Sequence, residues 1–306
     1  MKLQVQPRDG LGALISAVRQ AKKEIDILIF RCDRQELLQA LEAAVKRGVK
    51  VRTLIAHTNR GGEKALRKLE QRMLDAGATV ARTGDEFVRY HGKIMIVDRL
   101  TLWVLGYNFA ALDLRSRSFG VVTRSKADVQ QALKVFEADV TRQPYVPAGK
   151  SLVVSPENSR ALLSEFVSKA RKQLLIYDPK ISDPAMVKLL KDRVKNGVDV
   201  RVIGKVDKAA ADIPHEKYPG KRLHVRSIIR DGRAAFVGSQ SLRTLELDKR
   251  REVGLVLKNA TVVNEIVKTF EEDWALTDSG KQQRKAEASD AEQPRERQAR
   301  SRGLPG

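Results

Sequence analysis

The chain has 306 residues, of which 42% are hydrophobic, and its 58 lysines and arginines against 38 aspartates and glutamates leave a formal net charge of +20. This length allows two packed domains. No run approaches the roughly 20 apolar residues that span a bilayer, and Met1 to Gln4 does not begin a signal peptide. A single cysteine, Cys32, excludes an intrachain disulfide.

These features predict a soluble, cytoplasmic protein, with a peripheral position at a membrane as the second location. We expect a monomer. The excess of basic residues favours a polyanionic partner, either nucleic acid or an anionic lipid surface. General solubility is the plainer explanation of the same charge.

Strands and helices alternate in the first part of the chain. Glu24 to Phe30 has the composition of a strand, Gln35 to Lys46 has the spacing of an amphipathic helix, and Val49 to Ile55 is the next strand. We expect a helix-like stretch near Glu63 to Ala76, then strands around His91 and Leu102, and a closing helix from Ala127 to Val140.

A histidine motif lies between these elements. His91, Lys93 and Asp98 have the spacing His-x-Lys-x4-Asp, and a turn containing Asn108 follows. Residues two apart on a strand share a face, so we expect His91 and Lys93 to project together and Asp98 to end the strand. An imidazole beside a cation suits an anionic phosphorus centre, because one attacks or moves a proton and the other holds oxygens.

The remainder of the chain repeats the first part. Pro156 matches Pro7 at an offset of 149 residues, which falls to 133 at the histidines, so the second copy lacks the helix near residues 63–76. After a predicted linker at residues 143–149, the repeated elements are strands at 174–177 and 198–203, a helix near 186–195, a strand near Ala235 and a closing helix at 262–274.

The second copy carries its own histidine motif. His224, Arg226 and Asp231 repeat the spacing of the first, and a turn with Ser239 and Ser241 follows at the same distance. One copy alone would be half of a phosphodiester site. Two copies facing each other supply a nucleophile from one side and a proton donor from the other.

The predicted fold is α/β, with two homologous halves related by pseudo-twofold symmetry. Each half is an α/β sandwich around a mixed, largely parallel sheet. The predicted boundaries are 1–148 for the first half, 149–278 for the second and 279–306 for a basic tail. This tail has seven basic and four acidic residues and almost no large apolar ones, which predicts disorder.

The paired motifs resemble the signature of the phospholipase D superfamily, over about residues 1 to 275. The resemblance implies catalysis without metal or cofactor, in which one histidine forms a phosphohistidine and the other protonates the leaving alcohol. It also implies that Glu252 orients His91 from the opposite half, whereas Ser118 stands at the aligned place in the first copy. His91 is then the nucleophile and His224 the acid.

The resemblance further implies that Asn108, Ser239 and Ser241 bind substrate or orient the catalytic groups. Two departures leave alternatives open. Arg226 replaces a lysine and has a planar fork that fits oxygens differently, and Ser241 replaces an asparagine. The alternative explanation is that the second half is a purely structural copy. Asp98 and Asp231 either act in catalysis or tie the strand ends.

The family resemblance implies an enzyme that cleaves or transfers the phosphodiester of a phospholipid at an anionic membrane surface. The alternatives are a phosphodiesterase acting on nucleic acid and a phosphate-binding protein that has lost turnover. Aromatic residues are only 5% of the chain, which leaves little material for stacking on bases.

Overall fold

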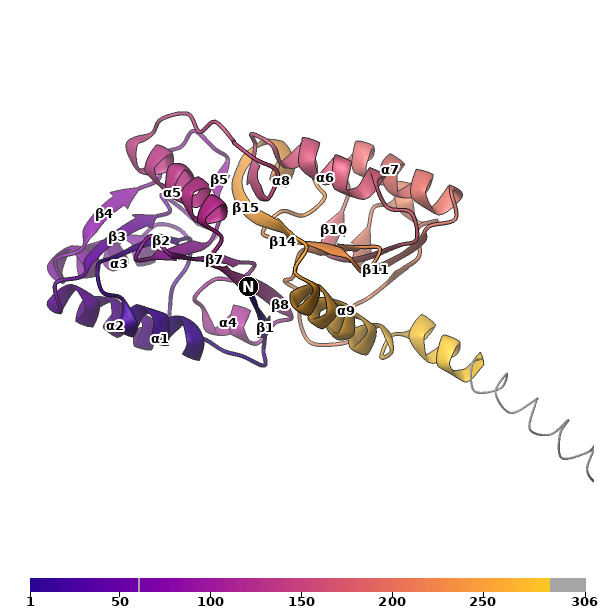
Figure 1. The fold of residues 1–306 in the computed structure, drawn as a ribbon, viewed down its shortest axis with the longest axis horizontal. Coiled ribbons are helices and arrows are strands. Elements are labelled where there is room, and N and C mark those ends of the chain that lie inside the picture. Colours follow the sequence, from indigo (N-terminus) through magenta and orange to yellow (C-terminus); the bar gives the residue numbers. More distant parts are fainter. Residues whose placement is uncertain (60, 287–306) are drawn as a thin grey trace, which may run out of the picture.

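The computed structural model describes residues 1–59 and 61–286, which form two α/β halves lying side by side (Figure 1). The first half is built on a seven-stranded sheet with the order β1-β8-β7-β6-β2-β3-β4. The second has an eight-stranded sheet with the order β12-β11-β10-β13-β14-β15-β5, and β9 also pairs with β15. The predicted duplication and fold class are confirmed.

The first half contains most of the predicted elements within one or two residues of their expected bounds. Its elements in chain order are β1 (Lys2–Gln6), α1 (Gly12–Gln20), β2 (Glu24–Ile29), α2 (Gln35–Lys46), β3 (Lys50–Ile55), α3 (Lys64–Asp75), β4 (Thr79–Arg82), β5 (Arg89–Tyr90), β6 (Ile94–Val97), β7 (Thr101–Leu105), α4 (Ala111–Leu114), β8 (Ser118–Thr123) and α5 (Lys126–Thr141).

The second half repeats this order with a shorter middle. Its elements are β9 (Leu152–Ser155), α6 (Ser159–Ser168), β10 (Gln173–Ile181), α7 (Pro184–Lys195), β11 (Asp199–Val206), the 3-10 helix η1 (Lys208–Ala210), β12 (His215–Glu216), β13 (Ser227–Arg230), β14 (Ala234–Gly238), α8 (Thr244–Asp248), β15 (Arg250–Leu257) and α9 (Ala260–Trp274). The short η1 stands where the first half has α3, as the drop in repeat offset predicted.

Local sequence signals explain why the helices start and which face they bury. Asp183 caps α7 by accepting a hydrogen bond from the backbone of Met186, and Pro184 takes the first helical position, where its missing N–H costs nothing. Asn259 caps α9 in the same way. The buried residues of α2 recur at helical spacing and pack onto the sheet; they are Leu37, Leu38, Ala40, Leu41 and Ala44.

Both sheets are mixed, but the expectation of largely parallel pairing is wrong. Strands β2, β3 and β4 run parallel, and so do β10, β11 and β12. The strands after each histidine return as hairpins, so β6, β7 and β8 pair antiparallel, as do β13, β14 and β15. The short connections of β6 to β7 and of β13 to β14 require antiparallel pairing, because parallel neighbours need a long crossover, whereas α4 and α8 lie in the longer connections to β8 and β15.

The two halves share one hydrophobic core along their junction. Phe119 of β8 meets Tyr177 of β10 ring to ring, with centroids 5.6 Å apart, and Tyr177 in turn meets Phe270 of α9. Strand β5 of the first half also pairs with β15 of the second. These contacts bring the first residues of β6 and β13, and the histidines that precede them, to the same junction.

The connection and the tail complete the chain. Residues 142–151, which include the predicted linker, contain no helix or strand. Residues 278–286 form a helix beyond α9, although the sequence predicted disorder from Ser279 onward, and the hydroxyl of Thr277 accepts a hydrogen bond from Gly280 at its start. The rest of the predicted tail, 287–306, lies outside the described residues.

Candidate active site

His91 and Lys93 lie just before β6 rather than on a strand, so the expectation that a strand holds them is corrected. The backbone of this segment pairs across the junction instead, since the N–H groups of His91 and Gly92 both donate to the carbonyl of Arg251, at 2.7 and 2.9 Å. Their side chains nevertheless lie together, because Lys93 Nζ is 3.0 Å from His91 Nε2. The first histidine is therefore held by the second half.

A carboxylate from the opposite half fixes the other ring nitrogen of His91. Glu252 Oε2 lies 2.8 Å from His91 Nδ1, and Glu252 is fully buried. An ionised carboxylate at this distance favours the tautomer that carries its proton on Nδ1, which leaves the lone pair of Nε2 free to attack. The edge of the Phe30 ring packs against the imidazole, with centroids 4.8 Å apart.

Burial and neighbouring cations lower the pKa of both His91 and Lys93. Desolvation, followed by the charges of Lys93 and Arg226, holds the pKa of His91 well below its ordinary value. Desolvation also lowers the pKa of Lys93 to about 7, against the opposing charge of Glu252. His91 is consequently a neutral imidazole at neutral pH, as a nucleophile must be.

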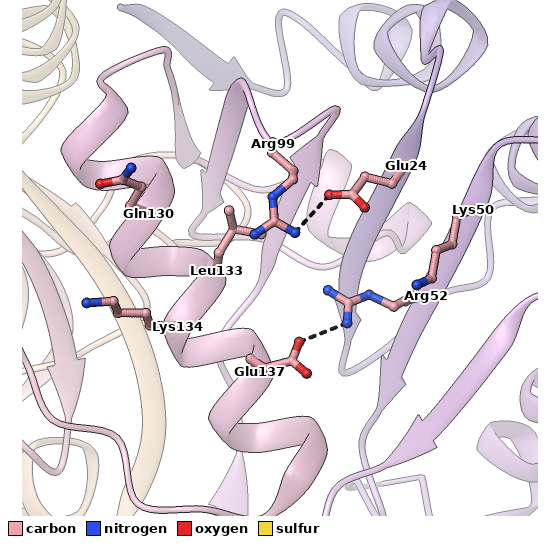
Figure 2. Close-up of a pocket in the computed structure, with 8 residues that line it drawn as sticks. All are labelled: Glu24, Lys50, Arg52, Arg99, Gln130, Leu133, Lys134 and Glu137. Carbon is pink, nitrogen blue, oxygen red and sulfur yellow. Dashed lines mark hydrogen bonds and ion pairs between the residues drawn. The ribbon is translucent and has the colours of Figure 1, made fainter.

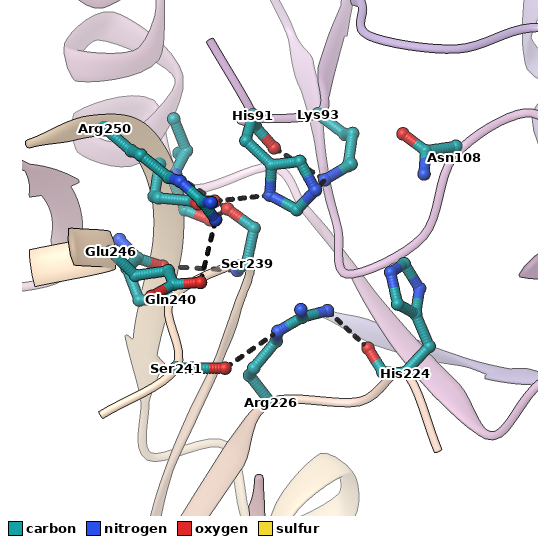
Figure 3. A network of polar contacts seen from close by, with 12 residues as sticks. His91, Lys93, Asn108, His224, Arg226, Ser239, Gln240, Ser241, Glu246 and Arg250 are labelled. Carbon is teal, nitrogen blue, oxygen red and sulfur yellow. Dashed lines mark hydrogen bonds and ion pairs between the residues drawn. The ribbon is translucent and has the colours of Figure 1, made fainter. Parts of the chain in front are cut away.

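His224 presents a similar arrangement from the second half. It precedes β13, its backbone N–H donates to the carbonyl of Arg117 at 2.9 Å, and Arg226 follows two residues later (Figure 3). Arg226 donates to the backbone carbonyl of His224 at 2.8 Å and to Ser241 Oγ at 3.3 Å. Desolvation and the charge of Arg226 hold the pKa of His224 well below its ordinary value.

A carboxylate that sequence reasoning missed stands beside His224. Asp113 Oδ1 lies 3.2 Å from His224 Nδ1, without the alignment of a hydrogen bond. Ser118 does occupy the aligned position on β8, but Asp113 of α4 supplies the negative charge instead. One signal could have found it: Glu246 of α8 lies 133 residues after Asp113, so both copies carry an acid at this place.

Arginines that the sequence analysis did not single out surround the two histidines. Arg222 Nη1 lies 2.6 Å from Asp113 Oδ1, and Arg250 Nη1 lies 2.8 Å from Glu246 Oε1. Arg250 is also 3.9 Å from Glu252 Oε1. Each histidine thus has a carboxylate beside its ring, and an arginine lies close to that carboxylate.

Three turn residues were expected to bind substrate or to orient the catalytic groups, and each has a different position in the structure. Asn108 donates to Asp113 Oδ2 at 2.6 Å and lines the cavity, so it holds the carboxylate beside His224. Ser241 contacts Arg226, as described above. Ser239 is buried against β15, where its hydroxyl accepts from the backbone of Val253 at 3.1 Å. Only Asn108 of these three faces the cavity.

Asp98 and Asp231 hold the ends of strands in place through hydrogen bonds to backbone N–H groups. The Asp98 carboxylate accepts backbone hydrogen bonds from Lys22, Lys23 and Glu24, at 2.7 to 3.1 Å. Asp231 accepts the equivalent bonds from residues 171–173. These bonds lower the pKa of both carboxyls. Neither residue lines the cavity, and of the two roles left open by the sequence, these contacts support the structural one.

One cavity of about 670 Å³ contains both histidines and spans the two halves. Its lining combines basic and apolar side chains with the acidic residues Asp33, Asp113 and Glu246. The basic residues are Arg31, Arg89, Arg222, Arg226, Arg243 and Arg250, and the apolar ones include Phe30, Ala65, Leu66, Leu69 and Leu223. A ligand that combines an anionic group with an apolar body matches this lining.

A second hollow of about 700 Å³ lies beside β2, β3 and α5 (Figure 2). Its arginines are paired, since Arg99 contacts Glu24 at 3.2 Å and Arg52 contacts Glu137 at 2.8 Å. No histidine, cysteine, serine or threonine is among the residues that line it. The cavity between the halves is therefore the candidate active site.

The arrangement supports transfer of a phosphoryl-type group. A neutral imidazole, whose Nε2 contacts Lys93, faces a second imidazole, and Lys93 and Arg226 stand beside them where oxygens of a tetrahedral phosphorus would gain negative charge (Figure 3). Within residues 1–59 and 61–286 no cluster of three or more His, Cys, Asp or Glu side chains has the geometry to hold a metal. In the same part of the chain, no helix is both long and apolar enough to cross a bilayer.

Duplicated α/β halves with one histidine and one cation each, meeting at a shared cavity, define a phospholipase D-type protein. The family model described as "Cardiolipin synthase, PLD-like domain" matches residues 14–140 and 163–274, and the chain belongs to this family. The two matched segments correspond to the two halves of the structure.

Individual relatives are distant. The chain is 25% identical over 332 residues to the major cardiolipin synthase ClsA of Bacillus subtilis (strain 168), covering 88% of this chain and 68% of that protein. Its fold is similar to that of phosphatidylserine synthase from Haemophilus influenzae Rd KW20, with a TM-score of 0.70, 14% identity and coverage of 90% and 85%.

A similar fold also occurs in polyphosphate kinase from Porphyromonas gingivalis, with a TM-score of 0.75 and 17% identity. That match covers 88% of this chain but only 46% of the kinase, so the chain spans less than half of that protein. At these identities the two structural matches show a shared fold alone.

Proposed function

We propose that this protein cleaves or transfers the phosphodiester of a phospholipid through a phosphohistidine intermediate, without a metal. The observation that carries the proposal is the pairing of each histidine with a cation and a carboxylate on opposite sides of one cavity. This pairing supplies a nucleophile, a proton donor and charge for the phosphate oxygens, which are the groups that a two-step displacement requires.

In the first step, His91 Nε2 attacks phosphorus and the bond from phosphorus to the leaving alcohol breaks. The alcohol oxygen takes a proton from His224. In the second step, His224 takes a proton from water or from an acceptor alcohol, whose oxygen attacks phosphorus while the bond to His91 breaks. Lys93 and Arg226 stabilise the charge on the oxygens throughout.

Binding of the substrate also changes the charge on His224. In the free protein, burial and Arg226 keep its imidazole neutral. An anionic phosphate beside His224 favours the protonated form of its imidazole, as does the Asp113 carboxylate. The proton donor is thus created when the substrate neutralises the surrounding cations.

A lipid substrate is supported by the apolar side of the cavity and by the family. Phe30, Leu66 and Leu69 lie next to the basic groups, where an acyl glycerol could contact them. The family model and the Bacillus subtilis relative both carry the name cardiolipin synthase. We propose by this similarity that the second substrate is an alcohol, which would make the protein a phosphatidyltransferase.

Activity is expected to survive excess chelator, because Lys93 and Arg226 supply positive charge at the reacting phosphorus. The measurement is release of head group or transfer product from phosphatidylglycerol vesicles, with and without EDTA. Complete loss in chelator, restored by one divalent metal, would contradict the metal-independent step.

Binding to anionic vesicles, and not to neutral ones, is expected from the formal charge of +20. Salt should weaken it, since exposed charges are screened within about 10 Å at 0.1 M. Deleting residues 279–306, which hold seven basic and four acidic residues, should weaken it only slightly. Sedimentation with vesicles measures this. Efficient cleavage of DNA, with no head group released from any phospholipid, would replace the lipid proposal by a nuclease.

A further inference from the structure

Arg117 and Arg251 occupy equivalent places in the two halves. They directly precede Ser118 and Glu252, which the pairing of β8 with β7 and of β15 with β14 aligns. Each side chain also bonds a carbonyl at the start of its own half: Arg251 donates to Ser155 at 2.9 Å and Arg117 to Gln6 at 3.4 Å. The duplication has therefore preserved this arginine together with its surroundings.

Each arginine reaches into the opposite half with its guanidinium. Arg117 forms a two-point ion pair with Asp273 of α9, with both distances at 2.8 Å. Arg251 lies 3.0 Å from Asp139 of α5, and both side chains are only 2% exposed. The two contacts of the Arg117–Asp273 pair fix the direction of its guanidinium. The buried Arg251–Asp139 pair makes one such contact, and neither partner can leave without stranding a charge.

The same two arginines hold the histidines with their backbone. The carbonyl of Arg117 accepts the N–H of His224, and the carbonyl of Arg251 accepts the N–H of His91. His224 and Asp273 belong to the second half, whereas His91 and Asp139 belong to the first. Arg251 of the second half thus joins α5 to the His91 segment of the first half. In the same way, Arg117 of the first half joins α9 to the His224 segment of the second half.

We propose that Arg117 and Arg251 are positioning residues that set where the two histidines stand across the junction. The Arg117–Asp273 pair controls His224, and the Arg251–Asp139 pair controls His91. Loosening one pair displaces one histidine and leaves the other in place. The kinetic readout below rests on the proposed function, whereas the spectroscopic one does not.

The two ion pairs differ in how far they are enclosed and in the partners that surround them. Arg251 has a second carboxylate partner, Glu157, and lies over the Phe87 ring at 4.4 Å. Arg117 side-chain exposure is 17%, and its partner Asp273 also accepts from the Tyr177 hydroxyl. The pair behind His91 is the more enclosed, which suits the histidine that forms the covalent bond.

The test compares Asp273→Asn and Asp139→Asn with Glu265→Gln. Glu265 contacts Arg8 at 2.6 Å across the same junction, but this pair is exposed and neither residue lines the cavity that contains the histidines, so it is a matched control. Imidazole NMR signals report on each histidine directly, and with four histidines in the chain they can be assigned. Thermal unfolding is measured for every variant.

Asp273→Asn is expected to shift the signals of His224 and not those of His91. It should lower kcat for a diester with a poor leaving group on the order of 10- to 100-fold, the loss expected for misplacement by about 1 Å, with KM unchanged. The rate at which an activated aryl diester releases its aryl group should be unchanged. Asp139→Asn should shift His91 and lower kcat for both substrates.

Arg117→Lys and Arg251→Lys serve as second variants should either asparagine variant fail to fold. Lysine keeps the charge, but it loses the two contacts of Arg117 with Asp273 and cannot span both Asp139 and Glu157 as Arg251 does. Unchanged histidine signals, or equal losses on both substrates that Glu265→Gln reproduces, would overturn the proposal. If the wild-type protein cleaves no phosphodiester, the proposed function fails, while the NMR comparison still decides the positioning role.

Discussion

His91→Asn is expected to abolish turnover of every phosphodiester, whereas His224→Asn should still release a good leaving group in the first step. His91 Nε2 is the free nitrogen of an imidazole whose Nδ1 meets Glu252, so its removal leaves no nucleophile. His224 supplies a proton to the leaving alcohol, which is worth about 10²- to 10⁴-fold with a poor leaving group. An aryl leaving group needs no such proton.

The measurement is the single-turnover rate of leaving-group release from an aryl and an alkyl phosphodiester in both variants. His215→Asn is the matched control, because His215 is exposed on β12 and does not line the cavity. Greater retention of aryl activity by the His91 variant than by the His224 variant would show that the two roles are reversed.

Lys93→Met is expected to lower kcat about 10²- to 10³-fold, the usual effect of removing one group that stabilises charge in a transition state. Lys93 is 1% exposed and its Nζ lies at the attacking nitrogen. Lys50→Met is a control, since Lys50 lies in the separate hollow beside α5 (Figure 2).

The same lysine sets the alkaline side of the pH profile. Burial lowers the pKa of Lys93 to about 7, so its charge is present below that pH and lost above it, and wild-type kcat/KM should fall as pH rises through this value. On the acid side, protonation of His91 should reduce kcat/KM only well below its ordinary pKa. A wild-type profile that stays flat to pH 9 would contradict the role of Lys93.

Local sequence patterns predicted the helices and strands whose structure depends mainly on their own residues. The helix at Gln35–Lys46 was expected with these bounds, because its apolar residues recur at helical spacing. The repeat offset predicted the loss of α3 from the second half. The spacing of His91 and Lys93 predicted two neighbouring side chains, although extended backbone before β6 holds them rather than a strand.

Contacts between the halves could not be predicted from local pattern. Asp113 lies in a four-residue helix, and only the docking of the second half brings it to His224. The same docking gives Arg251 its place behind His91. The direction of the hairpin strands was missed because short apolar runs do not show whether their neighbours are parallel.

Trapping the covalent intermediate tests the central claim that the two halves form one site with the nucleophile on His91. The protein is mixed with a phosphodiester substrate, quenched in base, where phosphohistidine survives, and digested for mass spectrometry. The account predicts a substrate-derived adduct on the peptide containing His91, its accumulation in His224→Asn and its absence in His91→Asn. An adduct on His224 alone, or turnover of substrate with no adduct on either histidine under single-turnover conditions, would contradict it.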